Sequence, residues 1–137
     1  MIDVALSRIV FRDGADRQYI FLAEALGSRG FPIVIGNSEA LEIQRVVHEF
    51  EPERPLTHQL TYAVIKALGA LIKSVDIVDL KHNTFYAHLV LQNEQGDVLK
   101  SIDARPSDAI ALALRARAQI RVAEPVLERA CETDGGP

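Results

Sequence analysis

Residues 107–118 constrain the fold most, because this segment has the length of a helix and is apolar on nearly every side, through Ile110, Leu112, Ala113 and Leu114. A helix with no polar face has to be buried by other elements. The chain therefore needs a second layer that can cover it. With 137 residues, it is long enough to build such a core without disulfide bonds.

Alternating and apolar segments elsewhere in the sequence predict the strands that form this second layer. Residues 84–92 alternate, with Phe85, Ala87, Leu89 and Leu91 on one face, as in a half-buried strand. Apolar stretches beside turn signals predict further strands at 2–12, 18–25, 31–35, 75–80 and 98–103. Apolar residues at helical spacing predict a helix from Ser38 and another from Thr57, the second with a helical stripe of Leu60, Val64, Ala67, Leu68 and Leu71.

Two parts of the chain share an order of hairpin, polar link and helix. Their helix starts correspond, Ser38-Glu39-Ala40-Leu41 in one and Ser107-Asp108-Ala109-Ile110 in the other. Either an internal duplication or chance explains a match this short. This order of hairpin, polar link and helix predicts an α+β fold: a mixed and largely antiparallel sheet with about four helices packed mainly on one face. We expect one domain over residues 1–131 and a disordered tail over 132–137.

Composition narrows the classes of function. The formal net charge of −4 disfavours a uniformly basic surface, so any phosphate contact has to come from a local cluster. A single cysteine, Cys131, fits a reducing compartment, and no apolar run approaches the ~20 residues that span a bilayer. We expect a cytoplasmic protein with no membrane contact. Motifs of zinc hydrolases, serine hydrolases and phosphate-binding loops are missing from the sequence.

The polar residues before the apolar helix are the first candidate site. In a structural interpretation Ser107 caps the helix, Asp108 favours its positive end, and Asp103 pairs with Arg105. In a functional interpretation two carboxylates and a guanidinium at a helix start suit a hydrated Mg²⁺ and a phosphate oxygen. The spacing alone leaves both interpretations open.

The segment Arg54-Pro55-Leu56-Thr57-His58 is the second candidate site. Thr57 is expected to cap a helix, with His58 in its first turn. The positive helix end there favours a neutral imidazole, which can act as a general base. A histidine that only forms a hydrogen bond beside a cap is the alternative.

Glu24 lies on the same face of its predicted strand as Ile20 and Leu22, among apolar residues. A carboxylate in that position needs a partner. An arginine is the simplest one, with Arg54 and Arg105 as the candidates, and a metal ion is the less favoured choice.

These motifs together resemble the bifunctional nuclease domain family. The resemblance covers about residues 2 to 131 and is carried, in the family's order, by Phe31-Pro32-Ile33-Val34-Ile35-Gly36, Glu39-Ala40, Arg54-Pro55-Leu56-Thr57-His58, Phe85-Tyr86-Ala87 and Asp103-Ala104-Arg105-Pro106-Ser107-Asp108-Ala109-Ile110-Ala111-Leu112-Ala113. It implies an α+β domain that self-associates, with a dimer favoured, and an activity on DNA and RNA like that for which plant members are named. One position departs from the pattern, because Gln59 stands where the family often has an acid.

The resemblance leads to two hypotheses. In the first, the protein is a metal-dependent nuclease in which Asp103 and Asp108, with Glu39, hold Mg²⁺ or Mn²⁺, and His58 accepts a proton from water. The substrate phosphate is then bound by Arg54, Arg105, Thr57 and Ser107. In the second, the domain is not catalytic, self-associates and binds a protein partner or a small anion. The same polar residues then only fix two helix starts.

Overall fold

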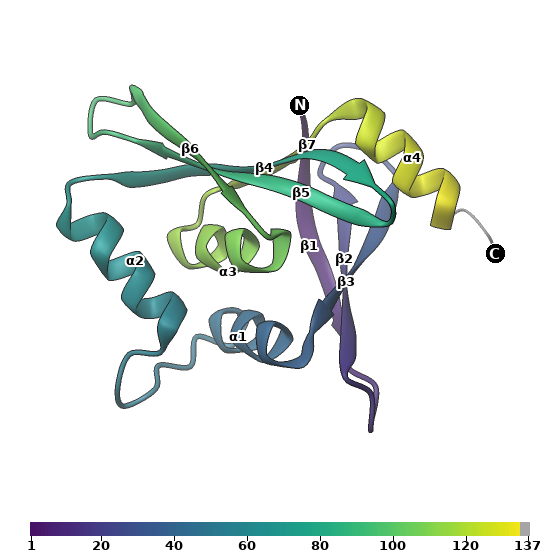
Figure 1. The fold of residues 1–137 in the computed structure, drawn as a ribbon, viewed down its shortest axis with the longest axis horizontal. Coiled ribbons are helices and arrows are strands. Elements are labelled where there is room, and N and C mark those ends of the chain that lie inside the picture. Colours follow the sequence, from purple (N-terminus) through teal and green to yellow (C-terminus); the bar gives the residue numbers. More distant parts are fainter. Residues whose placement is uncertain (135–137) are drawn as a thin grey trace.

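The structure is a computed structural model and describes residues 1–134. Eleven elements follow one another along the chain (Figure 1): β1 Ile2–Val10, β2 Arg17–Glu24, β3 Gly30–Gly36, α1 Asn37–Val47, α2 Thr57–Ala67, β4 Leu71–Lys81, β5 Thr84–Gln92, β6 Val98–Ala104, α3 Pro106–Ala116, β7 Gln119–Val122 and α4 Glu124–Asp134. Helix α4 includes 132–134, the first part of the expected tail, and 135–137 lie outside the described residues. Within residues 1–134, no helix combines the length and apolar character needed to cross a membrane.

All seven strands form one sheet, in the order β3-β2-β1-β7-β4-β5-β6. Neighbouring strands are antiparallel except β4 and β7, which are parallel. The predicted α+β fold with a mixed, largely antiparallel sheet is therefore confirmed.

The order of elements repeats along the chain. β1, β2 and β3 lead into α1, and β4, β5 and β6 lead into α3, while β7 lies between the two sets of strands. Helices α1 and α3 contact each other (Figure 1). The short match between the two helix starts in the sequence thus corresponds to two equivalent places in the fold.

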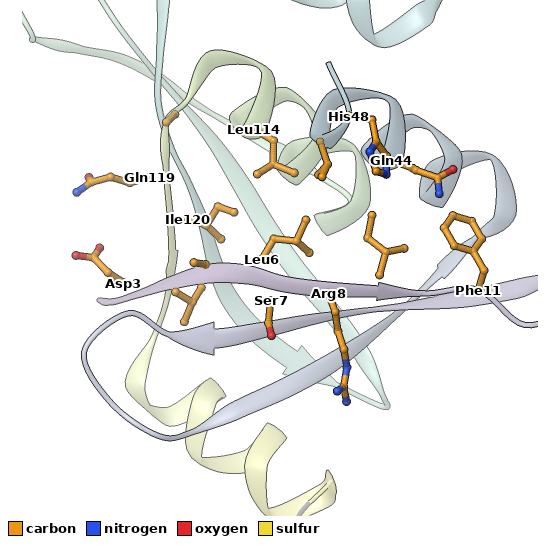
Figure 2. Close-up of a pocket in the computed structure, with 15 residues that line it drawn as sticks. Asp3, Leu6, Ser7, Arg8, Phe11, Gln44, His48, Leu114, Gln119 and Ile120 are labelled. Atoms are coloured by element: carbon orange, nitrogen blue, oxygen red, sulfur yellow. The ribbon is translucent and has the colours of Figure 1, made fainter. Parts of the chain in front are cut away.

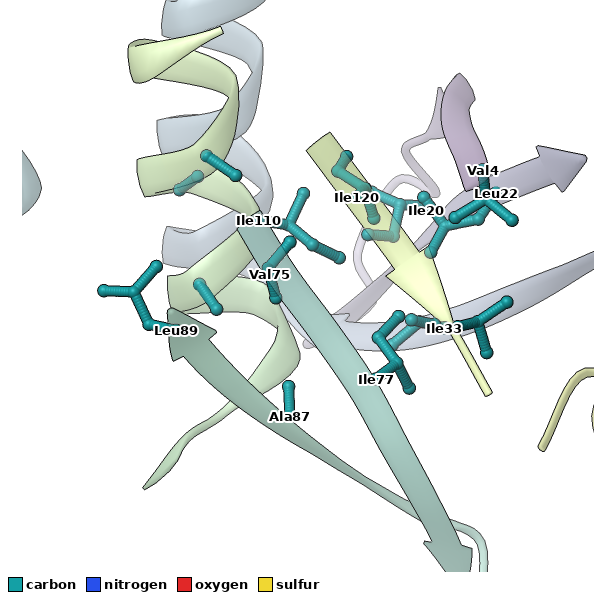
Figure 3. Close-up of a cluster of buried hydrophobic side chains, with 14 of the residues drawn as sticks. Val4, Ile20, Leu22, Ile33, Val75, Ile77, Ala87, Leu89, Ile110 and Ile120 are labelled. Atoms are coloured by element: carbon teal, nitrogen blue, oxygen red, sulfur yellow. The ribbon is translucent and has the colours of Figure 1, made fainter. Parts of the chain in front are cut away.

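The sheet curls, so that its two halves face each other. Phe31 of β3 and Phe85 of β5 have ring centroids 5.4 Å apart, although four strands separate β3 from β5 in the sheet. Ile43 of α1, Ile110 of α3 and Leu127 of α4 are fully buried in the same hydrophobic core as the inner strand residues. Figure 3 shows Ile110 next to Val75 of β4 in this core. Helices α1, α3 and α4 therefore all pack against the sheet around one hydrophobic core.

Helix α2 lies at the edge of this core, against which its Tyr62 and Ile65 pack (Figure 1). It has no buried residue, and Leu60, Val64 and Leu68 are 58%, 48% and 81% exposed. Its main contact is with α3. The predicted helical stripe holds for Leu60, Val64 and Ala67, but α2 ends at Ala67 and Leu71 begins β4. No described element covers this face of the helix.

The predicted serine and threonine caps are also wrong. The residues that cap α1, α2 and α3 are Gly36, Leu56 and Arg105, and in none of the three does the side chain of the cap residue form the cap hydrogen bond. Each helix begins one or two residues before the expected position; in α3, Pro106 occupies the first turn, where its fixed φ suits helix geometry. Capping therefore does not account for the hydroxyl of Ser107.

Candidate functional site

The first turns of α1, α2 and α3 line one open cavity of about 530 Å³. They contribute, among others, Glu39 from α1, Thr57 and His58 from α2, and Arg105 and Asp108 from α3. The N-terminus of a helix carries partial positive charge and free N–H groups. Three such ends around one cavity favour a bound anion.

His58 and Asp108 are in direct polar contact in this cavity. The imidazole Nε2 lies 2.8 Å from Asp108 Oδ1, and the side chains are 20% and 30% exposed. A carboxylate can only accept a hydrogen bond, so Nε2 carries the hydrogen. In a neutral imidazole, Nδ1 is then left with its lone pair and can accept a proton.

Arg105 links the same carboxylate to α1. Its Nε donates to Asp108 Oδ2 at 2.9 Å, and its Nη2 lies 3.6 Å from Glu39 Oε2. The hydrogen bond to Asp108 is the main cause that raises the pKa of Arg105, and the charges of Asp108 and Glu39 add to it. The Arg105 side chain is 66% exposed, so the guanidinium is charged and reachable from the cavity.

A buried network around Glu42 forms the adjacent wall. Glu42, with a 3% exposed side chain, accepts from Arg45 at 2.9 Å and from Arg115 at 3.3 Å, and Arg115 also reaches Glu51 at 3.3 Å. Arg115 Nε is buried and has no partner among the described residues. Sequence reasoning missed this network, although the i, i+3 spacing of Glu42 and Arg45 on a predicted helix was a signal for it.

Two of the predicted site residues lie outside this cluster. Asp103 is exposed on β6 opposite His88, on the sheet face away from Ala87, which is buried in the core. Because side chains alternate along a strand, Asp103 points to the face opposite the one on which Asp108 lies. Arg54 is exposed in the loop before α2 and makes no hydrogen bond or ion pair within residues 1–134.

Gln59 has a local structural role at the start of α2. Its Oε1 accepts a hydrogen bond from the backbone N–H of Leu56 at 2.7 Å, and its Nε2 donates to Glu51 at 3.3 Å. The position where the family often has an acid therefore stabilises a helix start in this chain.

The acidic groups do not form a preformed metal site. Both oxygens of Asp108 are already engaged, one by His58 and the other by Arg105, and Glu39 lies beside the same guanidinium. Within the described part of the chain, no group of three or more His, Cys, Asp or Glu side chains is arranged to hold a metal ion. A cation would have to displace Arg105, so this arrangement suits an anion better, and a requirement for Mg²⁺ or Mn²⁺ remains a prediction.

Glu24 has an arginine partner, as expected, but a different one. Arg29 in the β2–β3 connection binds both Glu24 and Glu124 of α4. These hydrogen bonds lower the pKa of Glu24 and of Glu124. The network ties β2 to α4 and contributes no residue to the cavity.

A separate cavity of about 630 Å³ lies between β1 and the ends of α1 and α3. Figure 2 shows Leu6, Leu114 and Ile120 around it, with Arg8 turned away and His48 at its rim. It contains none of the predicted site residues. His48 is therefore a suitable control for substitutions of His58.

Comparison with known proteins identifies the family of this chain. Residues 20–134 match the Bifunctional nuclease domain. An uncharacterized protein of Mycobacterium tuberculosis is 46% identical over 111 residues, which cover 81% of this chain and 65% of that protein. Bifunctional nuclease 1 of Oryza sativa subsp. indica is 27% identical over 115 residues, which cover 81% of this chain and 34% of that protein.

This chain thus spans less than two thirds of the length of the curated relatives that it matches. The match nevertheless includes the first turns of all three helices that line the His58 cavity. The chain belongs to the bifunctional nuclease domain family.

Proposed function

We propose that this domain hydrolyses phosphodiester bonds in DNA and RNA at the His58 cavity. The observation that carries the proposal is the contact of 2.8 Å between His58 and Asp108, which leaves Nδ1 as a base, while Arg105 binds the other oxygen of the same carboxylate. The names of the plant relatives support the same class of reaction.

The chemistry follows from the side chains. Asp108 orients the imidazole, and Nδ1 takes a proton from a water molecule as that water attacks phosphorus. The new P–O bond forms while the bond to the leaving oxygen breaks, and solvent supplies the proton that this oxygen needs. Arg105 balances the charge that develops on the phosphate. Because no 2′-hydroxyl takes part, one site serves both polymers.

Further substrate contacts belong to the same proposal. Thr57 lines the His58 cavity, and Ser107 lines the cavity next to it. Arg54 is exposed in the loop that leads into α2, with its charge available to a bound strand. Asp103 lies on the other face of the sheet, so we expect its substitution to change cleavage less than that of Asp108.

The test is digestion of DNA and of RNA by purified protein, with chelator, with Mg²⁺ and with Mn²⁺. Wild type and His48→Ala should cleave, and His58→Ala and Asp108→Asn should lose roughly a hundredfold or more of the rate. The three conditions also decide whether a metal ion is needed. If all four proteins cleave equally, the activity comes from a contaminant or from another site.

A non-catalytic domain is the second candidate, and one observation favours it. Asp108 joins the first turn of α2 to that of α3 through His58, so the contact also serves as a structural tie. Under this alternative His58→Ala lowers the melting temperature, and no wild-type preparation cleaves either polymer under any of the three conditions.

We also propose that the domain is a homodimer in the cytoplasm. Two antiparallel α2 helices would cover each other's exposed stripe of Leu60, Val64 and Leu68, since a two-fold interface uses the same patch on both copies. The lone cysteine, Cys131, is partly buried and fits a reducing compartment.

A further inference from the structure

A second cavity adjoins the His58 cavity. It has a volume of about 700 Å³ and lies between β3, the β4–β5 turn and the starts of α1 and α3. Arg105 and Glu39 line both cavities, so their ion pair forms the shared wall. A strand bound at His58 could therefore continue past Arg105 into this space.

One end of the cavity is suited to a phosphate group. Arg105 and Arg17 line it, and the starts of two helices contribute positive potential. Ser107 also lines it, with only 6% of its surface exposed, and its hydroxyl makes no hydrogen bond to any described residue. This oxygen is not sealed from solvent, so it is open to the cavity, where a ligand oxygen can take the place of water as its hydrogen-bond partner.

The other end is suited to a flat apolar group. Phe85 lines it and is held in place by the ring of Phe31 at 5.4 Å. Val34 and Leu80 add apolar surface, and Asn83 adds an amide. Since β3 is an edge strand, the backbone groups on its free side have no strand partner and can hydrogen-bond to polar edges of a ligand.

We infer that this cavity binds one nucleotide of the strand that is cut. The phosphate lies toward Arg105 and Ser107, and the base packs against Phe85, because aromatic side chains stack on bases of any sequence. The inference rests on the proposed nuclease function and adds to it the recognition of the nucleotide that follows the scissile phosphate. A base and a phosphate on one ligand match the two ends of the cavity, whereas inorganic phosphate fills only one of them.

Binding of 5′-AMP, ribose 5-phosphate and inorganic phosphate to the full chain tests this inference, by calorimetry or by NMR titration. These probes contain no phosphodiester bond, so binding is read without cleavage. We expect 5′-AMP to bind roughly tenfold more tightly than inorganic phosphate, since stacking adds to the phosphate contacts.

Two pairs of variants locate the ligand. Ser107→Ala should weaken binding of 5′-AMP and of phosphate roughly tenfold, and should not lower the melting temperature, because the hydroxyl has no protein partner to lose. Ser101→Ala, at an exposed position on β6, is its control. Phe85→Leu should weaken binding of 5′-AMP alone, and Tyr86→Leu, whose side chain is exposed, should change neither.

The outcomes separate this inference from the proposed function. If His58-dependent cleavage is found but 5′-AMP binds no better than phosphate, or binds Ser107→Ala and wild type equally, the nucleotide site is wrong and the nuclease stands. If 5′-AMP binds as expected and no polymer is cut, the cavity is a nucleotide site and the nuclease proposal is wrong.

Discussion

Glu39 and Asp108 occupy the same position, the third residue, of two different helices, and both carboxylates lie against the guanidinium of Arg105. The repeated order of strands and helix explains how they come together. Helices α1 and α3 follow equivalent sets of three strands and contact each other, which brings their first turns to one cavity. Arg105 is therefore the residue whose substitution tests the cavity most directly.

Arg105→Gln should reduce cleavage roughly a hundredfold, because the growing charge on the phosphate loses its partner. Arg105→Lys should retain more of the rate than Arg105→Gln, because lysine keeps the positive charge but cannot bind the phosphate in the bidentate geometry of the guanidinium. The measurement is kcat and KM on a defined DNA substrate. Arg117→Gln, on an 88% exposed side chain, is the control, and wild-type kinetics for Arg105→Gln would remove Arg105 from the mechanism.

Much of the fold was predictable from the sequence, because hydrophobic period and turn signals are local properties. The alternation in 84–92 and the apolar helix at 107–118 indicated β5 and α3. The spacing of Leu60, Val64 and Ala67 indicated a helix, but Leu71 lies in β4. The exposure of the stripe depends on what packs against it, which periodicity does not show. The helix caps were wrong because the Gly-Asn and Arg-Pro steps start the helices before the hydroxyl residues.

The candidate site was predictable in part. His58, Asp108, Arg105 and Glu39 were named from motifs, but the sequence could not show that one guanidinium joins two helices. The place of Asp103 could not be predicted, because alternation along a strand does not give its register with the next one. In the structure Asp103 lies opposite His88, and Ala104 lies opposite Ala87, which is in the core. The partner of Glu24 was missed because the nearby Arg29 lies in a turn, where side-chain direction has no simple period.

Arg29→Gln should lower stability at neutral pH and have little effect in acid. Arg29 lowers the pKa of Glu24 and of Glu124 from their ordinary value of 4.5. A carboxylate whose pKa is lower in the folded state stabilises the fold above its unfolded pKa, and this contribution is lost as the pH falls through the folded pKa. Urea unfolding should thus show a clear gap between variant and wild type at about pH 7 and a small one at about pH 3. A gap that stays constant with pH would contradict the assignment.

Glu42→Ala should destabilise the fold by about 3 kcal/mol, because breaking a buried ion pair leaves Arg115 without its buried partner. Glu128→Ala, at an exposed position on α4, should change stability by less than about 0.5 kcal/mol. Chemical denaturation of both variants measures the difference. Equal effects would mean that solvent, and not Glu42, balances the charge of Arg115.

Val64→Asp should convert the proposed dimer to a monomer. Val64 lies in the middle of the exposed stripe of α2 and is 48% exposed, so a charge there costs little in a monomer and disrupts an apolar interface. Light scattering coupled to gel filtration should give a mass near 15.1 kDa for the variant and twice that for wild type. Val98→Asp, at a similarly exposed position on β6, is the control and should remain dimeric. A wild-type chain that runs as a monomer at all concentrations would contradict the dimer, and a dimer that survives Val64→Asp would place its interface away from α2.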